Sequence, residues 1–337
     1  MESLLAWGLS VTQWLQDTYP QLERVMVAVS ALGKFEVYLV FFPLLYWCIH
    51  KKYGKYLAYL LSIAGVLNAA FKHGFRQPRP FWLDPTRQLG EADGYGLPSG
   101  HAQMTIIIYA LIAFWVRRPV VWLLAVLFIL LMGLSRIYLG VHFVHDVFIG
   151  YALGFLILLA YPIWMRYFRI RFLNRILGQR LLAVILVPVL LVALYVGMIL
   201  LIGEPDLEVA WAAYVPAAEL TAYEEWSRAL GLLAGLGIGF ILEASRVYFV
   251  VAGSWPKRLL RYLLGMATLL ALWLGLGALF PDDPLWLAIP LRILRYLITG
   301  LWVAYYAPWL FVRLNLADTS PESEVKLTVS DHSIMRE

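Results

Sequence analysis

Two histidines and one aspartate in this sequence have the types and spacing for nucleophilic and acid–base chemistry. His142 and Asp146 are four residues apart, so they share one face if a helix continues there. A carboxylate so placed can hold one imidazole nitrogen protonated and leave the other free to attack. His101 follows a Pro-Ser-Gly turn, where it could protonate a leaving oxygen and later activate water. Because the two histidines start in opposite protonation states, we expect a bell-shaped dependence of activity on pH.

Lys72, Arg79 and Arg136 are cations that could stabilise a phosphoryl group during transfer. Such a group spreads charge over its equatorial oxygens, and fixed cations neutralise that charge. Arginine adds paired donors that match the geometry of a phosphate. The turn at Ser99 and Gly100 lets backbone N–H groups approach an anion at the start of the next helix. We therefore expect Lys72, Arg79, Ser99, Gly100 and Arg136 to bind phosphate.

The chemistry is expected to need no metal and no cofactor. No Asp or Glu group in the sequence has metal-ligand spacing beside these residues, and the fixed cations supply the charge that Mg²⁺ would otherwise supply. Three nearby side chains have simpler interpretations. Arg76 and Arg87 are expected to snorkel and bind lipid phosphates non-specifically. His145 is expected to form hydrogen bonds at the level of the lipid headgroups.

Membrane-spanning helices must position these residues. Of the 337 residues, 62% are hydrophobic and 15% are charged, which is more apolar surface than a soluble domain can hide. Apolar windows of about 20 residues predict an all-α polytopic membrane bundle of about nine transmembrane helices, with a six-helix-like core followed by C-terminal helices. The predicted spans are 30–50, 55–73, 101–116, 119–137, 144–165, 181–202, 229–251, 259–280 and 290–312. Only Arg117-Arg118-Pro119 separates the third span from the fourth, so a tight hairpin is expected there.

The distribution of apolar and charged residues divides the chain into five predicted parts. They are an interfacial N-terminal segment (1–29), the core (30–203), an outer acidic loop (204–228), additional transmembrane helices (229–312) and a polar, disordered cytoplasmic tail (313–337). Lys and Arg are concentrated in alternate loops, which assigns those loops to the cytoplasm and the reactive residues to the opposite face. Within the last helices, we expect Glu243 to pair with Arg246, and Arg292 and Arg295 to gather anionic lipids.

Three motifs, in order along the chain, resemble the signature of a known family. They are Lys72-x6-Arg79-Pro80, Pro98-Ser99-Gly100-His101 and Ser135-Arg136-x5-His142-x3-Asp146. The set resembles the type 2 phosphatidic acid phosphatase superfamily, which comprises integral-membrane lipid phosphatases and related acid phosphatases and haloperoxidases. The resemblance covers roughly residues 30–200. It implies a helical core, a phosphohistidine intermediate and no metal. His142 would be the nucleophile, His101 the general acid and Asp146 the partner of His142, and the residues assigned above would bind the phosphate.

These observations predict a phosphatase that acts on a lipid mono- or diphosphate. The resemblance implies undecaprenyl diphosphate, phosphatidylglycerophosphate or phosphatidic acid as the substrate. We expect a multi-pass protein of the bacterial inner membrane whose active site faces the periplasm. Its expected partners are membrane lipids and not nucleic acid, and its oligomeric state stays open. Two alternatives also stay open: a phosphotransferase that passes the phosphoryl group to another lipid, and a non-catalytic lipid transporter or scaffold.

Overall fold

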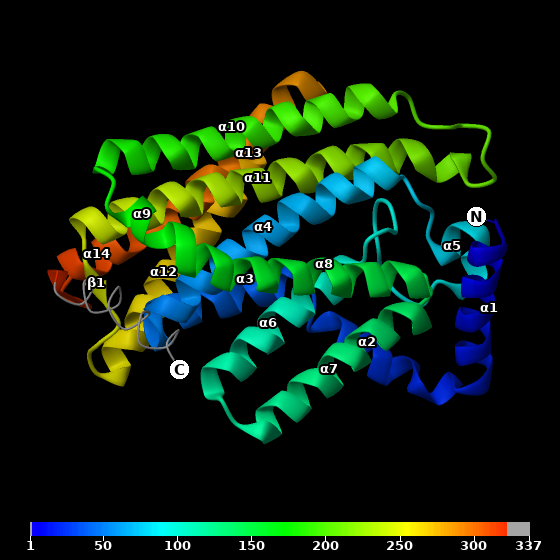
Figure 1. The fold of residues 1–337 in the computed structure, drawn as a ribbon, viewed down its shortest axis with the longest axis horizontal. Helices are drawn as coiled ribbons and strands as arrows, with labels where there is room; N and C mark the ends of the chain where they lie inside the picture. The colour runs from blue at the N-terminus through cyan, green and yellow to red at the C-terminus, as the bar shows by residue number, and fades with distance from the viewer. Residues whose placement is uncertain (1, 322–337) are drawn as a thin grey trace. The chain divides into compact units, whose positions relative to one another are not determined.

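The protein is built almost entirely of helices (Figure 1). The structure is a computed structural model that describes residues 2–321. The α-helices are α1 (Glu2–Thr18), α2 (Glu23–Ala31), α3 (Phe35–Leu44), α4 (Lys51–Phe75), α5 (Pro80–Leu83), α6 (Gly100–Val116), α7 (Pro119–Tyr138), α8 (Val144–Ile163), α9 (Arg169–Leu173), α10 (Leu177–Ile202), α11 (Val215–Arg246), α12 (Trp255–Leu279), α13 (Leu285–Leu301) and α14 (Ala307–Arg313). Two short strands, β1 (Phe249–Val250) and β2 (Asp318–Thr319), pair antiparallel. The prediction of an all-α fold is confirmed.

Seven helical stretches of the described residues are long and apolar enough to cross a membrane. They are Lys51–Leu83, Pro119–Tyr138, Val144–Leu173, Leu177–Ile202, Ala212–Arg246, Trp255–Leu279 and Leu285–Arg313. The bent pair Pro20–Ala31 and Glu36–Ile49 would add an eighth. The polytopic membrane bundle is confirmed, but the count by length is seven or eight instead of about nine. The difference arises because the predicted span 101–116 forms α6, which has only 17 residues.

The helices group into two compact units, and neither unit is one continuous stretch of chain. Unit 1 comprises Met1–Tyr38, Ala64–Leu159 and Leu194–Trp226. Unit 2 comprises Leu39–Ile63, Ala160–Ala193 and Ser227–Glu337. Every residue that the sequence analysis assigned to catalysis or to phosphate binding lies in unit 1.

Within unit 1, α6 and α7 form the predicted tight hairpin (Figure 1). Arg117 ends α6 in the left-handed conformation, with φ of 55°, and Pro119 is the first residue of α7. Proline suits that position because the first helical residue has no intrahelical N–H bond to lose. Leu123 and Leu124 on α7 are 59% and 60% exposed, as expected for a helix face that contacts lipid. The hairpin therefore brings the start of α6 and the end of α7 to the same end of unit 1.

The predicted N-terminal segment contains α1, which is anchored within unit 1. The buried Thr12 hydroxyl donates to the carbonyl oxygen of Ile137 at 3.1 Å. The Gln16 amide donates to the carbonyl oxygens of Arg87 and Tyr138 at 2.9 and 2.7 Å. These bonds hold α1 against the end of α7. An interfacial position for this segment stays a prediction.

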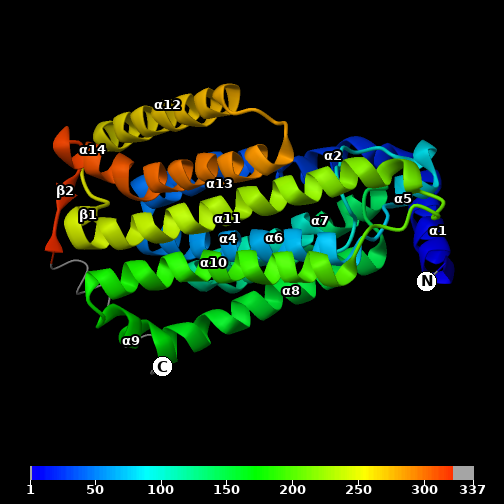
Figure 2. The same cartoon turned by 90° about the horizontal axis from the view of Figure 1, so that it is seen from above.

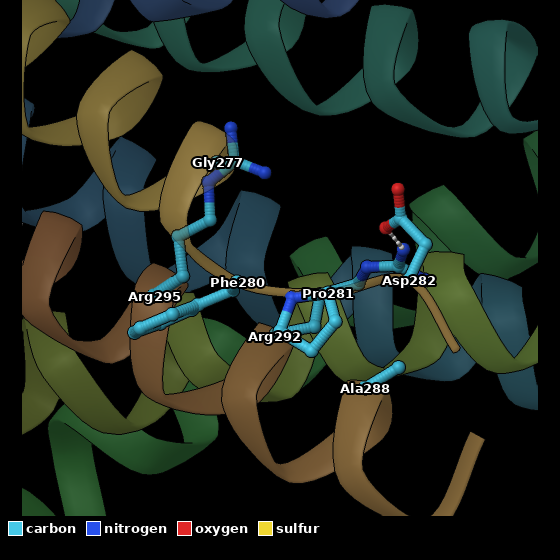
Figure 3. Close-up of a pocket in the computed structure, with 7 residues that line it drawn as sticks. All are labelled: Gly277, Phe280, Pro281, Asp282, Ala288, Arg292 and Arg295. Atoms are coloured by element: carbon cyan, nitrogen blue, oxygen red, sulfur yellow. Dashed lines mark hydrogen bonds and ion pairs between the residues drawn. The ribbon is translucent and has the colours of Figure 1, made fainter. Parts of the chain in front are cut away.

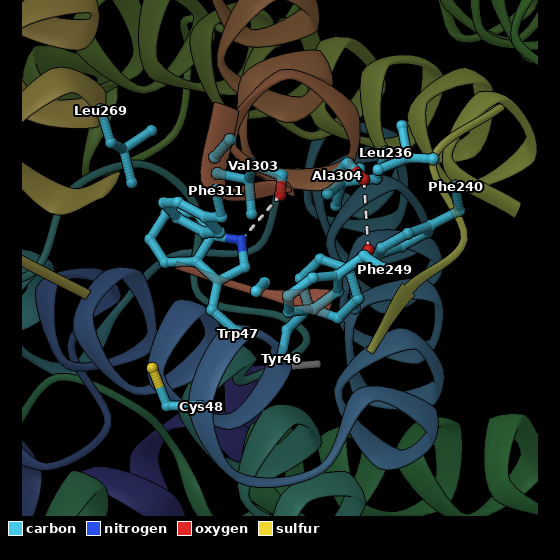
Figure 4. Close-up of a cluster of buried hydrophobic side chains, with 14 of the residues drawn as sticks. Tyr46, Trp47, Cys48, Leu236, Phe240, Phe249, Leu269, Val303, Ala304 and Phe311 are labelled. Carbon is cyan, nitrogen blue, oxygen red and sulfur yellow. Dashed lines mark hydrogen bonds between the residues drawn. The ribbon is translucent and has the colours of Figure 1, made fainter. Parts of the chain in front are cut away.

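Unit 2 has an aromatic core, drawn in Figure 4. Trp47 and Tyr46 are fully buried, and their side chains donate to the carbonyl oxygens of Val303 and Ala304 at 3.0 and 3.2 Å. These bonds satisfy the polar atoms of two large buried rings. In the same unit, α12 and α13 lie side by side (Figure 2).

Two predicted boundaries differ from the structure. The acidic segment 204–228 is not all loop, since α11 begins at Val215 and its first turns carry Glu219 and Glu225. In the predicted polar tail 313–337, β2 pairs with β1, so that part of the tail is ordered. Residues 322–337 of the tail lie outside the described residues.

Glu243 in α11 forms the most buried ion-pair network of unit 2. Its fully buried carboxylate lies 2.8 Å from the Nζ of Lys51 and 2.8 Å from that of Lys55. It also accepts the backbone N–H of Phe249 at 2.9 Å. The expected pair of Glu243 with Arg246 is therefore wrong, because two lysines of α4 neutralise the carboxylate instead.

Replacing Glu243 by alanine should destabilise the protein strongly, because Lys51 and Lys55 would lose the carboxylate that neutralises them. We expect a loss of about 3–5 kcal/mol in the free energy of unfolding. Thermal unfolding in detergent would show a clear decrease in midpoint. Asp282→Asn is the matched control, since it breaks a pair with Arg292 in which the aspartate is 85% exposed. That change should cost less than about 1 kcal/mol. Equal effects of the two variants would contradict the prediction.

Candidate active site

The carboxylate of Asp146 is held by the start of α8. Its Oδ2 accepts the backbone N–H of Phe143 at 2.9 Å and lies 3.4 Å from Nδ1 of His142. Asp146 is the third residue of α8, so this contact resembles half of a capping box. His142 precedes the helix, so the expectation that both residues share a helix face is wrong. The spacing of four residues brings them together through the helix cap instead.

Arg79 is fixed by five hydrogen bonds and is only 2% exposed. Its Nε and Nη2 donate to the carbonyl oxygens of Gly94, Asp93 and Tyr95 at 2.7, 2.6 and 3.0 Å. Its Nη1 donates to the carbonyl oxygen of Val141 at 2.7 Å and contacts Nε2 of His142 at 3.3 Å. All five guanidinium N–H groups are thereby used. The bond to His142 is the one that an incoming phosphate oxygen could take over.

The contacts of His142 define its tautomer. Arginine can only donate, so Nε2 must accept from Arg79 and carry no proton. The proton of the neutral ring is then on Nδ1, which faces Asp146. Burial lowers the pKa of His142 well below its usual value, and the nearby charges of Arg79, Arg136 and Lys72 lower it further. At neutral pH the ring therefore presents a lone pair on Nε2.

The start of α6 contributes Ser99, Gly100 and His101. Ser99 caps the helix, its side chain accepting the N–H of Ala102 at 3.5 Å, and its own N–H donates to the backbone carbonyl of Asp146 at 3.0 Å. This bond joins the α6 turn to the start of α8. The first N–H groups of a helix have no intrahelical partner, so those of Gly100 and His101 are available to an anion. Nε2 of His101 is buried and has no hydrogen-bond partner among the described residues.

Arg136 near the end of α7 is 4% exposed. Its Nη1 donates to the hydroxyl of Ser30 on α2. Its Nε is buried and has no partner among the described residues. An N–H group left in this way is costly unless a ligand or water accepts from it. Arg136 is therefore well suited to bind a phosphate oxygen.

Lys72 makes a contact that the sequence analysis missed. Its Nζ lies 3.1 and 2.9 Å from the two carboxylate oxygens of Glu225 on α11. The sequence offered only one signal for this pair, the excess of acidic residues in 204–228, and that signal was interpreted as loop composition. The eight predicted residues all belong to unit 1, and an additional carboxylate contacts Lys72.

A second carboxylate of α11, Glu219, organises the surroundings. It accepts from Nε of Arg76 at 2.8 Å and from the Tyr95 hydroxyl at 2.7 Å. It also lies 2.9 Å from Nε2 of His73, whose other nitrogen contacts the Tyr195 hydroxyl at 2.6 Å. Since the Tyr95 carbonyl accepts from Arg79, this network helps to position the guanidinium beside His142.

The side chains of Arg76, Arg87 and His145 are held within the protein, and their contact with lipid headgroups stays a prediction. Arg76 pairs with Glu219, and Arg87 pairs with Asp17 at 2.6 Å, so both have protein partners. His145 lies with Nε2 3.3 Å from Oδ1 of Asp146, and its ring stacks on Phe143. His145 is therefore a second neighbour of the Asp146 carboxylate and not only a surface group.

A small pocket in unit 2 is lined by Arg292 and Arg295 (Figure 3). Arg292 donates to the Asp282 carboxylate at 2.9 Å, and Arg295 donates to the Trp273 carbonyl at 3.0 Å. Both guanidinium groups therefore have partners within unit 2. Their role in gathering anionic lipids stays a prediction.

The described helices, and the His142–Asp146 pair beside buried cations, fit the family that the motifs resemble. Residues 53–170 match the PAP2 superfamily, and residues 227–319 match the PAP2 superfamily phosphatase, transmembrane extension. The chain belongs to the PAP2 superfamily. Glu219 and Glu225 lie between the two matched regions.

Three relatives illustrate the range of named activities. The chain is 29% identical to lipid phosphate phosphatase delta of Arabidopsis thaliana, over 41% of this chain and 37% of that protein. It is 30% identical to glucose-6-phosphatase 3 of Rattus norvegicus, over 46% of this chain and 52% of that protein. It is 34% identical to undecaprenyl-diphosphatase of Sulfolobus acidocaldarius, over 40% of this chain and 66% of that protein. The chain thus spans about half or less of the length of the first two relatives.

The lowered pKa of His142 predicts where activity is lost in acid. As pH falls through this pKa, Nε2 takes up a proton and loses its lone pair, so kcat/KM should decrease only below about pH 6.5. Arg136→Gln removes a positive charge that disfavours the protonated form of His142, so the pKa of His142 should rise. The acidic limb of the pH profile of kcat/KM should then move to higher pH. Arg136→Lys keeps the charge and should leave the limb close to its original position. An acidic limb that is the same in the glutamine variant would contradict this assignment.

Proposed function

We propose that the protein is a lipid phosphatase that removes phosphate from a lipid mono- or diphosphate through a phosphohistidine intermediate. The observation that supports this most directly is His142, whose Nε2 is unprotonated and lies within a group of three buried cations. Asp146 faces the other ring nitrogen at 3.4 Å. The proposed reaction needs no metal, because Lys72, Arg79 and Arg136 supply the positive charge at the phosphate.

In the first step, Nε2 of His142 attacks phosphorus and the bond from phosphorus to the leaving oxygen breaks. Arg79 transfers its Nη1 hydrogen bond from the imidazole to a phosphate oxygen, which frees the attacking lone pair. Asp146 stabilises the positive charge that develops on the ring. His101 donates a proton to the leaving oxygen, and the negative charge of the substrate favours its protonated form.

In the second step, water attacks the phosphohistidine. His101, now neutral, accepts a proton from that water as the new P–O bond forms and the N–P bond breaks. The products are inorganic phosphate and the regenerated neutral His142. The N–H groups at the start of α6 and the Nε of Arg136 bind the equatorial oxygens in both steps.

The surroundings support a lipid as the substrate. Along the chain, helices long and apolar enough to cross a membrane lie on both sides of the reactive residues. A lipid tail could therefore remain in the bilayer while its phosphate reaches the site. The distribution of Lys and Arg favours a site at the outer face of the inner membrane. Undecaprenyl diphosphate, phosphatidylglycerophosphate and phosphatidic acid are the candidates to test.

The test is phosphate release from these three lipids by purified protein in the presence of EDTA. We expect wild-type activity to persist, and His142→Ala and His101→Ala to reduce kcat by about a thousandfold or more. His50→Ala, which removes an imidazole from unit 2, is the matched control and should retain activity.

Three results would contradict the proposal. Loss of wild-type activity on chelation would exclude a metal-independent reaction. Phosphate release only when a second lipid is added, with the label recovered on that lipid, would identify a transferase. Full function of His142→Ala in cells would favour a scaffold.

A further inference from the structure

Glu225 places a negative charge on one of the cations assigned to phosphate binding. Both of its carboxylate oxygens lie within 3.1 Å of the Lys72 Nζ. The same charge also acts on Arg79. A lysine ammonium has three donors, and this pairing engages it before any substrate arrives. A phosphate must therefore share Lys72 with the carboxylate or displace it.

The two partners differ in their freedom to move. The Lys72 side chain is 9% exposed, whereas the Glu225 side chain is 29% exposed. The lysine is buried in the site, but the carboxylate is partly exposed and has room to move. An exchange of anions on Lys72 would therefore move Glu225 and not the lysine.

Glu219 lies on the same helix and, in contrast to Glu225, is a carboxylate with several partners. It interacts with Arg76, His73 and Tyr95. Among the described residues, the hydrogen bonds of the Glu225 side chain are to Lys72 alone. Glu219 is thus held by three partners, while in the described part of the chain Glu225 is held by Lys72 alone, and a stronger anion can displace it from that one partner.

We propose that Glu225 is a displaceable internal anion that competes with phosphate for Lys72 and thereby sets how tightly the site holds a phosphate that has no lipid tail. This inference rests on the proposed function and extends it. The competition weakens every phosphate by a similar factor, but a lipid phosphate gains binding energy from its tail that free phosphate lacks. Glu225 therefore lowers the affinity for small soluble phosphates, which bind through the phosphate alone, and promotes release of the inorganic phosphate product, while a lipid phosphate still binds through its tail.

Glu225→Gln tests the inference in the full-length protein in detergent, because it removes the charge and keeps the size. We expect the inhibition constant of inorganic phosphate to decrease by about tenfold, as expected when one like charge is removed. The KM for a short-chain soluble phosphate ester should decrease by a similar factor, and kcat should change less. Glu208→Gln removes an exposed charge from the same acidic segment and should change none of these values.

Phosphate binding measured by calorimetry separates this inference from the proposed function. Tighter binding to Glu225→Gln in a protein that hydrolyses no lipid phosphate would support the inference and refute the function. Active protein with unchanged or weaker phosphate binding in the variant would refute the inference alone, since Glu225 would then only position Lys72. In a Lys72→Met background, Glu225→Gln should have a much smaller effect. An effect of the same size there would show that the competition does not act through the lysine.

Discussion

The guanidinium of Arg79 is the interaction on which the active site depends. It holds three consecutive carbonyl oxygens, from Asp93 to Tyr95, and at the same time reaches Nε2 of His142. A buried arginine is stable only when its donors are satisfied, so the loop must adopt this conformation for the site to fold. The bond to His142 also selects the tautomer of that ring, because a group that can only donate requires an unprotonated nitrogen. The conformation of the loop and the tautomer of His142 thus have one cause.

The loop can reach Arg79 because two of its residues are glycines. Gly94 has φ of 65°, a conformation that residues with a side chain rarely adopt. A Cβ at Gly96 would lie 2.5 Å from the carbonyl oxygen of Pro78 and 3.1 Å from Oδ2 of Asp146. Any larger residue there would clash with the Pro78 backbone and press against the Asp146 carboxylate. The apolar character of the surrounding helices fixes where the loop begins and ends. The two glycines fix how closely the loop approaches Arg79.

Much of this site was predictable from the sequence, because its central residues lie in short motifs at helix ends. The order of the motifs and the α6–α7 hairpin predicted that Lys72, His101 and His142 would meet. The contact of Asp146 with His142 was also predicted, although for the wrong reason. A spacing of four residues serves a helix cap as well as a helix face, and only the residue at which α8 begins distinguishes the two.

The carboxylates of α11 were not predictable in the same way. Glu225 is 153 residues from Lys72, and nothing in a local pattern specifies a contact across that distance. Hydropathy also misleads at this point, because charged residues in the first turns of a helix resemble a loop when averaged over a window. What the sequence does contain is an imbalance, since three buried cations near one carboxylate would repel each other. Buried charges in a bilayer need partners. The excess positive charge therefore favours a further anion, and Glu225 of the acidic segment supplies it within unit 1.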